Sequence, residues 1–309
     1  MRAAVISSPR EVRICERRAP EPGPGEVLVA LDGAGICASE LPVWQGREWF
    51  SYPLAAGEPG HEGWGRVAAC GEGVQGLSRG ERVALISQRA HAEYDLAPAR
   101  SVVPLPAAWA PEAPFPGEPL ACAVNVHRRA ALTGGERVAV LGAGFLALAL
   151  VQLLAGAGAR VEVVARRRAA LERALQAGAE RVWGMEERGL QGPFDVVIEA
   201  TGAQAPLDLA GQLCAVRGRL VIAGYHQDGP RQVDMRLWNW RGLDVINAHE
   251  RDPAVYAEGL RAAVRAVQAG RLRPAALITH RFSLQRLGEA YALAAARPDG
   301  FVKAVWQRD

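Results

Sequence analysis

Four residues of the kinds that bind transition metals stand in glycine-rich contexts along this chain. His61 and Glu62 lie within "GEPGHEGWG" (57–65), Cys37 within "GAGICASELP", and Glu118 within "GEPLACAVNVHRR". Thiolate, imidazole and carboxylate together suit Zn²⁺, which takes a tetrahedral site and keeps an open position when it is catalytic. Alone, each residue would more often be structural, and Cys37 would pass for a small buried hydrophobe. Together they predict a zinc site, and the glycines would let His61 and Glu62 both turn toward one ion.

A second motif predicts a dinucleotide site. "VAVLGAGFLALAL" places Gly142, Gly144 and Ala147 as G-x-G-x-x-A after a strand and at the start of a helix. In this pattern the first glycine allows a tight turn, the second admits the pyrophosphate, and the alanine keeps the helix close to the strand. We also expect the cofactor to contact Phe145, Leu146, Thr201 and Gly224.

The end of the next strand favours NADP(H) over NAD(H). An acid about 20 residues beyond the glycines would hold the ribose 2′-hydroxyl, whereas an arginine would accept a 2′-phosphate. The segment reads "VEVVARRRAAL", with Ala165 where the acid would stand and Arg166, Arg167 and Arg168 following; Glu162 comes too early. At least one of the arginines is expected to be an ordinary solvated helix start, and Arg166 is the favoured phosphate contact because it lies nearest the strand end.

Length and composition limit the classes of protein. The chain has 309 residues, of which 50% are hydrophobic and 22% charged, and its net charge of +3 is spread along the sequence. No cluster of basic and aromatic residues indicates a nucleic-acid partner. The five cysteines are widely spaced without a C-x-x-C, which favours a reducing cytoplasm. The longest apolar run is broken by glycine, so we expect no membrane span.

Hydrophobic patterning divides the chain into two kinds of fold. Residues 1 to about 120 show short alternating strands separated by glycine and proline. Further on, six apolar strands alternate with helical segments: 137–144, 159–165, 179–184, 194–202, 218–224 and 242–248. This alternation predicts an α/β fold with a doubly wound parallel sheet. We expect a mostly-β catalytic domain over 1–122, a cofactor domain over 123–270, and a return of 271–309 to the first domain.

The order of these motifs resembles the zinc-containing medium-chain dehydrogenase/reductase family, which is alcohol dehydrogenase-like. "GICASE", "GHEGWG" and "VLGAGFLA" occur in the family's order, and the resemblance covers nearly the whole chain. "EPLACAVNVHRR" is similar to the polyol, sorbitol and threonine dehydrogenase branch. The resemblance implies a GroES-like catalytic domain followed by a six-stranded Rossmann domain.

The resemblance also implies roles for single residues. Cys37 and His61 would be zinc ligands, Glu62 a ligand or an adjacent carboxylate that exchanges with water, and Glu118 the fourth ligand or the residue that holds the zinc-bound water. Ser39 would pass the substrate proton, and Glu40 would hydrogen-bond the histidine ligand and fix its tautomer.

Two departures from the family pattern are evident. The four-cysteine lobe that holds a structural zinc in many relatives is missing, so we expect one catalytic zinc only. The histidine that exports the proton in many relatives is replaced by Pro42, so the proton must leave by another route.

These observations predict a zinc-dependent oxidoreductase that transfers a hydride between a nicotinamide cofactor and a secondary alcohol or ketone. A polyol, cyclitol or amino alcohol is the expected substrate. Two alternatives remain: a zinc-free quinone or enone reductase of the same superfamily, and a non-catalytic NADPH-binding protein. We expect a homodimer or homotetramer, in which the strand near 242–248 could pair across a two-fold axis.

Overall fold

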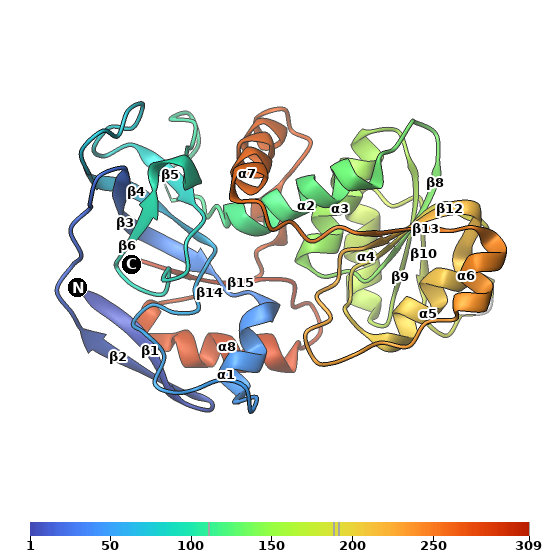
Figure 1. Ribbon diagram of the computed structural model, residues 1–309, viewed down its shortest axis with the longest axis horizontal. Coiled ribbons are helices and arrows are strands. Elements are labelled where there is room, and N and C mark those ends of the chain that lie inside the picture. Colours follow the sequence, from blue (N-terminus) through green and yellow to red (C-terminus); the bar gives the residue numbers. More distant parts are fainter. Residues whose placement is uncertain (111, 188, 191, 309) are drawn as a thin grey trace. The chain divides into compact units, whose positions relative to one another are not determined.

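The computed structural model describes residues 1–110, 112–187, 189–190 and 192–308. The chain divides into two compact units (Figure 1). The first contains Met1–Ala121, Asp252–Val264 and Pro274–Asp309, and the second contains Cys122–Arg251 and Arg265–Arg273. The segment 252–264, which we expected in the cofactor domain, thus clusters with the first unit.

The first unit is mostly β. Its strands are β1 (Arg2–Ser8), β2 (Glu11–Glu16), β3 (Glu26–Gly35), β4 (Gly63–Cys70), β5 (Arg82–Leu85), β6 (Tyr94–Pro98), β7 (Val102–Pro104), β14 (His280–Phe282) and β15 (Ala304–Gln307). Its helical segments are η1 (Ala38–Glu40), α1 (Leu41–Gln45), η2 (Ala99–Ser101), the start of α2 (Gly117–Ala130), most of α7 (Pro253–Gln268), η3 (Pro274–Leu277), η4 (Leu284–Arg286) and α8 (Leu287–Ala296).

Strand β3 organises this unit. It pairs antiparallel with β4 along one edge and with β6 and β15 along the other, within a seven-stranded sheet (Figure 1). Its ten residues, with the consecutive apolar side chains of Val27, Leu28 and Val29, make β3 long enough for three partners. The C-terminal strand β15 therefore returns to the first unit, and its Trp306 is buried in the same core as Leu31 and Tyr291. This core supports the segments that leave β3 and enter β4.

The second unit is a parallel α/β domain. Its elements are β8 (Arg137–Leu141), α3 (Phe145–Gly156), β9 (Arg160–Ala165), α4 (Arg168–Ala177), β10 (Arg181–Gly184), β11 (Phe194–Glu199), α5 (Gln204–Leu213), β12 (Cys214–Ile222), α6 (Met235–Arg241) and β13 (Asp244–Asn247).

The six strands of the second unit are parallel in the order β10-β9-β8-β11-β12-β13. The prediction of a six-stranded doubly wound sheet is confirmed. The strand order reverses between β8 and β11, and ligands of such sheets bind beyond the carboxyl ends of the strands at this switch point. The predicted phosphate loop directly follows β8.

All five cysteines are free thiols. Among the described residues, no helix combines the length and the apolar character that crossing a bilayer requires.

Candidate metal centre and cofactor edge

Antiparallel pairing of β3 and β4 brings the Cys37 and His61 segments together. Ala34 near the end of β3 lies opposite Gly63 at the start of β4, and the amide of Gly35 donates to the carbonyl of Glu62 at 3.2 Å. Cys37 follows β3 by two residues, and His61 precedes β4 by two. Because one strand ends where its neighbour begins, two segments far apart in the sequence meet at one edge of the sheet.

Cys37, His61 and Glu62 form a compact group of potential ligands. One ligand atom from each lies within 4.8 Å of the others. Across the described part of the chain, no other set of three such side chains has this spacing. Glu118, in the first turn of α2, is not part of the group, and its Oε1 accepts a hydrogen bond from the hydroxyl of Tyr256.

The surroundings of His61 indicate which ring nitrogen faces the ligand group. Its Nδ1 lies 2.9 Å from the carbonyl oxygen of Pro59 and 3.4 Å from Oε1 of Glu40. Both neighbours are acceptors, so Nδ1 carries a proton and Nε2 is the nitrogen left for a metal. Burial by itself would lower the pKa of His61, but Cys37, Glu118 and Glu40 raise it well above its ordinary value.

Glu40 is a buried carboxylate between two histidines and a tyrosine. Its Oε2 accepts hydrogen bonds from Nε2 of His91 at 2.9 Å and from the hydroxyl of Tyr291 at 2.8 Å. Burial would raise the pKa of Glu40, but His91, His61 and Tyr291 hold that pKa below its ordinary value. The resemblance placed Glu40 next to the histidine ligand; in the structure the closer acceptor for His61 is the carbonyl of Pro59.

Lys303 is a buried residue of this site that the sequence analysis did not identify. It immediately precedes β15, and its Nζ donates to Oε1 of Glu62 at 2.6 Å. Burial by itself would lower the pKa of Lys303, but Glu62, Cys37 and Glu40 together raise it above its ordinary value. The only sequence signal was a lone lysine inside the apolar stretch "FVKAVW".

The other carboxylate oxygen of Glu62, Oε2, lies close to the backbone of β3 at Gly35. Oε2 is buried and has no hydrogen-bond partner in the described structure. A Cβ built on Gly35 would lie 1.8 Å from this oxygen, so only glycine leaves room for it there. A buried carboxylate oxygen without a partner is costly, and a bound cation beside Cys37 and His61 would satisfy it.

We expect the Lys303→Met variant to unfold more easily than the native protein. The change leaves Glu62 buried without its cation, and breaking a buried pair from one side costs about 3–5 kcal/mol. Chemical denaturation of the metal-free protein would measure the loss. The double variant Lys303→Met with Glu62→Gln should recover part of it, and a single variant as stable as the native protein would contradict the burial argument.

Ser39 lies beside the proposed ligand sulfur. Its Oγ donates to Sγ of Cys37 at 3.1 Å, within the single turn of η1. Because the hydroxyl proton is directed at sulfur, the oxygen lone pairs remain available to accept a hydrogen bond from another group. Pro42, in the place of the missing relay histidine, occupies the first turn of α1.

The glycines of the phosphate loop take the conformations that the motif predicts. Gly142 has φ +112°, and a Cβ at this position would lie 3.0 Å from Cγ2 of Thr201. Gly144 is the N-cap of α3, and the space where its Cβ would stand is open to at least 4 Å. Ala147, in the first turn of α3, is buried. Phe145 is buried and Leu146 partly exposed at the N-terminus of α3, whose free N–H groups attract phosphate.

The arginine run after β9 separates into three situations. Ala165 is buried at the strand end and Arg166 is exposed beside it. Arg167 is the N-cap of α4, and Arg168 lies 3.4 Å from Glu172 on the exposed face of that helix.

The only acid of β9 is bound elsewhere. Glu162 is buried, with Oε1 accepting from Arg137 at 3.0 Å and Oε2 accepting from the indole of Trp183 at 2.7 Å. Glu162 is therefore not available to a ligand at the carboxyl end of β9.

Thr201 and Gly224 surround a buried carboxylate that the sequence analysis missed. Glu199, the last residue of β11, accepts hydrogen bonds from the amide and hydroxyl of Thr201 and from Nε2 of His226 at 3.0 Å. A Cβ on Gly224 would lie 2.2 Å from the amide nitrogen of Gly202. These residues fix the loop after β11, which packs on the phosphate loop at Gly142.

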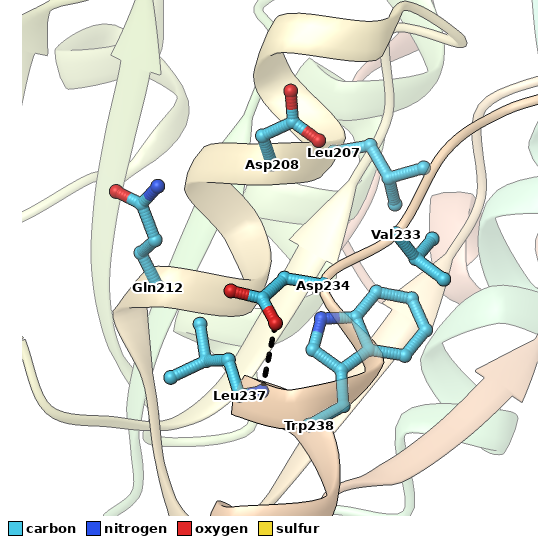
Figure 2. A pocket seen from close by; sticks show the side chains of 7 residues that line it. All are labelled: Leu207, Asp208, Gln212, Val233, Asp234, Leu237 and Trp238. Atoms are coloured by element: carbon cyan, nitrogen blue, oxygen red, sulfur yellow. Dashed lines mark hydrogen bonds between the residues drawn. The ribbon is translucent and has the colours of Figure 1, made fainter.

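A hollow elsewhere in the second unit contains none of the predicted residues. It has a volume of about 210 Å³ between α5 and α6. Figure 2 shows its lining, in which Asp234 accepts from the amide of Leu237: Leu207, Asp208, Gln212, Val233, Asp234, Leu237 and Trp238. These side chains include no serine, cysteine, lysine or histidine.

Comparisons with known proteins agree with this architecture. Residues 23–107 match the family model of the alcohol dehydrogenase GroES-like domain, and residues 146–265 match that of zinc-binding dehydrogenases. The L-threonine 3-dehydrogenase of Ruegeria pomeroyi is 27% identical, with 99% of this chain and 100% of that protein covered. The sorbitol dehydrogenase of Gallus gallus is 27% identical, with 94% of this chain and 92% of that protein covered.

Solved structures extend the similarity to the whole fold. The alcohol dehydrogenase RspB of Escherichia coli CFT073, in complex with NADH, has a TM-score of 0.88 at 26% identity and covers 100% of this chain and 99% of that one. A zinc-binding dehydrogenase of Sinorhizobium meliloti 1021, bound to NADP, has a TM-score of 0.86 at 25% identity, with 99% of both chains covered.

Proposed function

Because the chain belongs to the zinc-type medium-chain alcohol dehydrogenase family, we propose that it is a zinc-dependent dehydrogenase that interconverts a secondary alcohol and its ketone with NADP(H). The enzyme class is an NAD(P)-dependent alcohol dehydrogenase. A polyol, cyclitol or amino alcohol is the proposed substrate, in agreement with the sorbitol and threonine dehydrogenases among the relatives. The observation that carries the proposal is the group of Cys37, His61 and Glu62, whose ligand atoms lie within 4.8 Å of one another.

The side chains of this group fit one zinc ion. They offer one sulfur, one imidazole nitrogen and one carboxylate oxygen, a set that Zn²⁺ accepts in catalytic sites. The orphaned Oε2 of Glu62 supports a cation at this place, while Lys303 holds Oε1 of the same carboxylate. We propose Cys37 and His61 as ligands, Glu62 as a ligand through Oε2, and Glu118 as the residue that holds a water or substrate hydroxyl.

The chain's own residues would bind the alcohol and move its proton. Bound zinc would lower the pKa of the alcohol, and the nicotinamide would take up the hydride from the carbinol carbon. Ser39 would take up the alcohol proton at Oγ while its own hydroxyl proton, directed at Cys37 before the step, turns away and passes to solvent, so that the neutral hydroxyl is restored. In the reverse direction the same hydroxyl would return a proton to the ketone oxygen.

Three features of the second unit support NADP(H). Gly142 and Gly144 provide a tight turn and an open approach at the N-terminus of α3. Ala165 ends β9 without a carboxylate, and Glu162 is already held by Arg137 and Trp183. The exposed guanidinium of Arg166 can pair with a 2′-phosphate.

The native protein should bind NADPH roughly ten- to a hundredfold more tightly than NADH, because a charge-assisted contact with phosphate contributes about 1.5–3 kcal/mol. The double variant Ala165→Asp with Arg166→Ala should reverse this preference, since the new carboxylate repels the phosphate and binds the ribose hydroxyls. Isothermal titration with both cofactors measures the ratio.

Arg168→Ala is the matched control for the cofactor variants. Arg168 lies in the same basic run but pairs with Glu172 on the helix surface, so its loss should leave the preference unchanged. Tighter binding of NADH by the native protein would mean that the whole run is a solvated helix start.

We also propose that two copies associate through the edge of the parallel sheet. Strand β13 ends the strand order, and three of its four residues are exposed. Trp240 of α6 and Val245 of β13 are 87% and 42% exposed, a concentration of apolar surface that a second copy could cover.

A further inference from the structure

A buried chain of hydrogen bonds runs from strand β15 to Glu40, whose Oε1 lies 3.4 Å from Nδ1 of His61, the proposed histidine ligand. It begins at the indole of Trp306 in β15 and passes through His91 to Glu40. Trp306, His91 and Glu40 are each at most 1% exposed. We propose that Trp306 and His91 are positioning residues that fix Glu40, and through Glu40 the orientation and tautomer of His61. This inference rests on the proposed zinc site.

The direction of this chain is set by chemistry at its first link. The indole N–H of Trp306 can only donate, and it lies 3.1 Å from Nδ1 of His91 and 3.2 Å from the carbonyl of Ala90. A proton on Nδ1 of His91 would face this donor, so Nδ1 must be the unprotonated nitrogen. The ring proton of His91 therefore resides on Nε2.

The second link transmits this direction to Glu40. Nε2 of His91 donates to Oε2 of Glu40 at 2.9 Å, and the hydroxyl of Tyr291 donates to the same oxygen at 2.8 Å. The Tyr291 ring is also edge-on to His91, with ring centroids 5.9 Å apart. Two donors on Oε2 leave Oε1 of Glu40 as an acceptor, and Oε1 is the atom that lies 3.4 Å from Nδ1 of His61.

Backbone hydrogen bonds also connect the segment of His91 with the segment that bears His61. The amide of His91 donates to the carbonyl of Gly57 at 3.1 Å, and the amide of Ala90 donates to that of Gly60 at 2.8 Å. A Cβ on Gly60 would lie 2.6 Å from the His91 nitrogen, so glycine permits this approach next to His61. The segment that bears His61 is thus attached to His91 by its backbone as well as through Glu40.

This arrangement would preorganise the ring of His61 for metal binding. His61 presents Nε2 with its ring already oriented, because acceptors hold the proton on Nδ1. Partners of this kind typically change metal affinity by about 10- to 100-fold when they are removed. The His91→Phe variant keeps an aromatic ring but loses the donor to Glu40, and we expect its zinc dissociation constant to rise by about tenfold or more.

Two measurements test the proposal. The first is zinc affinity, by competition with a chromophoric chelator, for the native protein and for His91→Phe, His91→Gln and Tyr291→Phe. His91→Gln can still donate to Glu40 and should restore most of the affinity. Val67→Ala truncates the same core without removing a polar atom, so it controls for general loosening and should bind zinc as the native protein does.

The second measurement reads the tautomer of His91 directly. In ¹⁵N spectra of the metal-free protein, Nδ1 of His91 should resonate as an unprotonated ring nitrogen, and this signature should weaken in Trp306→Phe. A protonated Nδ1 in the native protein, or unchanged zinc affinity in His91→Phe, would overturn the inference. A native protein that binds no zinc would instead refute the proposed function, while the tautomer measurement still tests the polarity of the chain.

Discussion

The Cys37→Ser variant should contain almost no zinc and should have lost on the order of a thousandfold or more of its alcohol dehydrogenase activity. Sulfur is the softest ligand of the proposed site, and a serine hydroxyl at neutral pH does not replace a thiolate. Polarisation of the substrate oxygen by a metal contributes several kcal/mol to catalysis, and each 1.4 kcal/mol corresponds to a factor of ten in rate. Elemental analysis of protein purified without chelator should give about one zinc per native chain.

Cys214→Ser is a matched control for this experiment. Cys214 is a buried thiol at the start of β12, and burial raises its pKa to about 12. It therefore stays protonated and is not one of the proposed metal ligands. Its serine variant should keep its zinc. Full activity in Cys37→Ser would refute zinc dependence and favour a zinc-free reductase of the same superfamily, whereas a native protein inactive toward every alcohol would favour an NADPH-binding protein.

The Ser39→Ala variant should turn over about a hundredfold more slowly while it retains zinc and binds NADPH normally. A positioned acid–base group typically contributes about 10²- to 10⁴-fold. Ser39 also donates to Cys37, but loss of one hydrogen bond to a bound sulfur should affect metal affinity far less than turnover. Steady-state kinetics with a secondary alcohol, together with zinc analysis, separates the two roles.

Ser39→Thr supplies the comparison for the proton-transfer role. Threonine keeps the hydroxyl and adds one methyl group at a half-buried position, so most of the turnover should return. If alanine and threonine variants were equally fast, the proton would leave by another route and Ser39 would only orient Cys37.

Sequence reasoning found the elements that carry local signals. The G-x-G-x-x-A pattern can be recognised from the sequence because its strand, turn and helix are consecutive. In the structure Gly142 has a positive φ. The six parallel strands are found for the same reason, as each is a short apolar run between helical segments. Cys37, His61 and Glu62 were singled out by their residue types and by glycine contexts, and β-pairing brings them into one group.

Residues whose role depends on distant pairing could not be found in this way. Lys303 and Trp306 reach this site only because β15 pairs with β3. Nothing in "FVKAVW" specifies which carboxylate or imidazole these two side chains contact. The role of His91 likewise depends on the close approach of its segment to Gly60. Glu118 lies outside the 4.8 Å group and accepts a hydrogen bond from Tyr256, so its role as a ligand or as the residue that holds a water stays a prediction.

The return of β15 to β3 also has a consequence for how the protein is made. Cys37 emerges from the ribosome long before Lys303 and Trp306, and the whole continuous segment Cys122–Arg251 of the second unit is synthesised in between. The second unit can therefore complete its sheet while the first still lacks its last strand. Until β15 is released, Glu62 has no cation and His91 no indole donor. The proposed metal centre can thus be completed only after β15 has been synthesised, later than the sheet of the second unit.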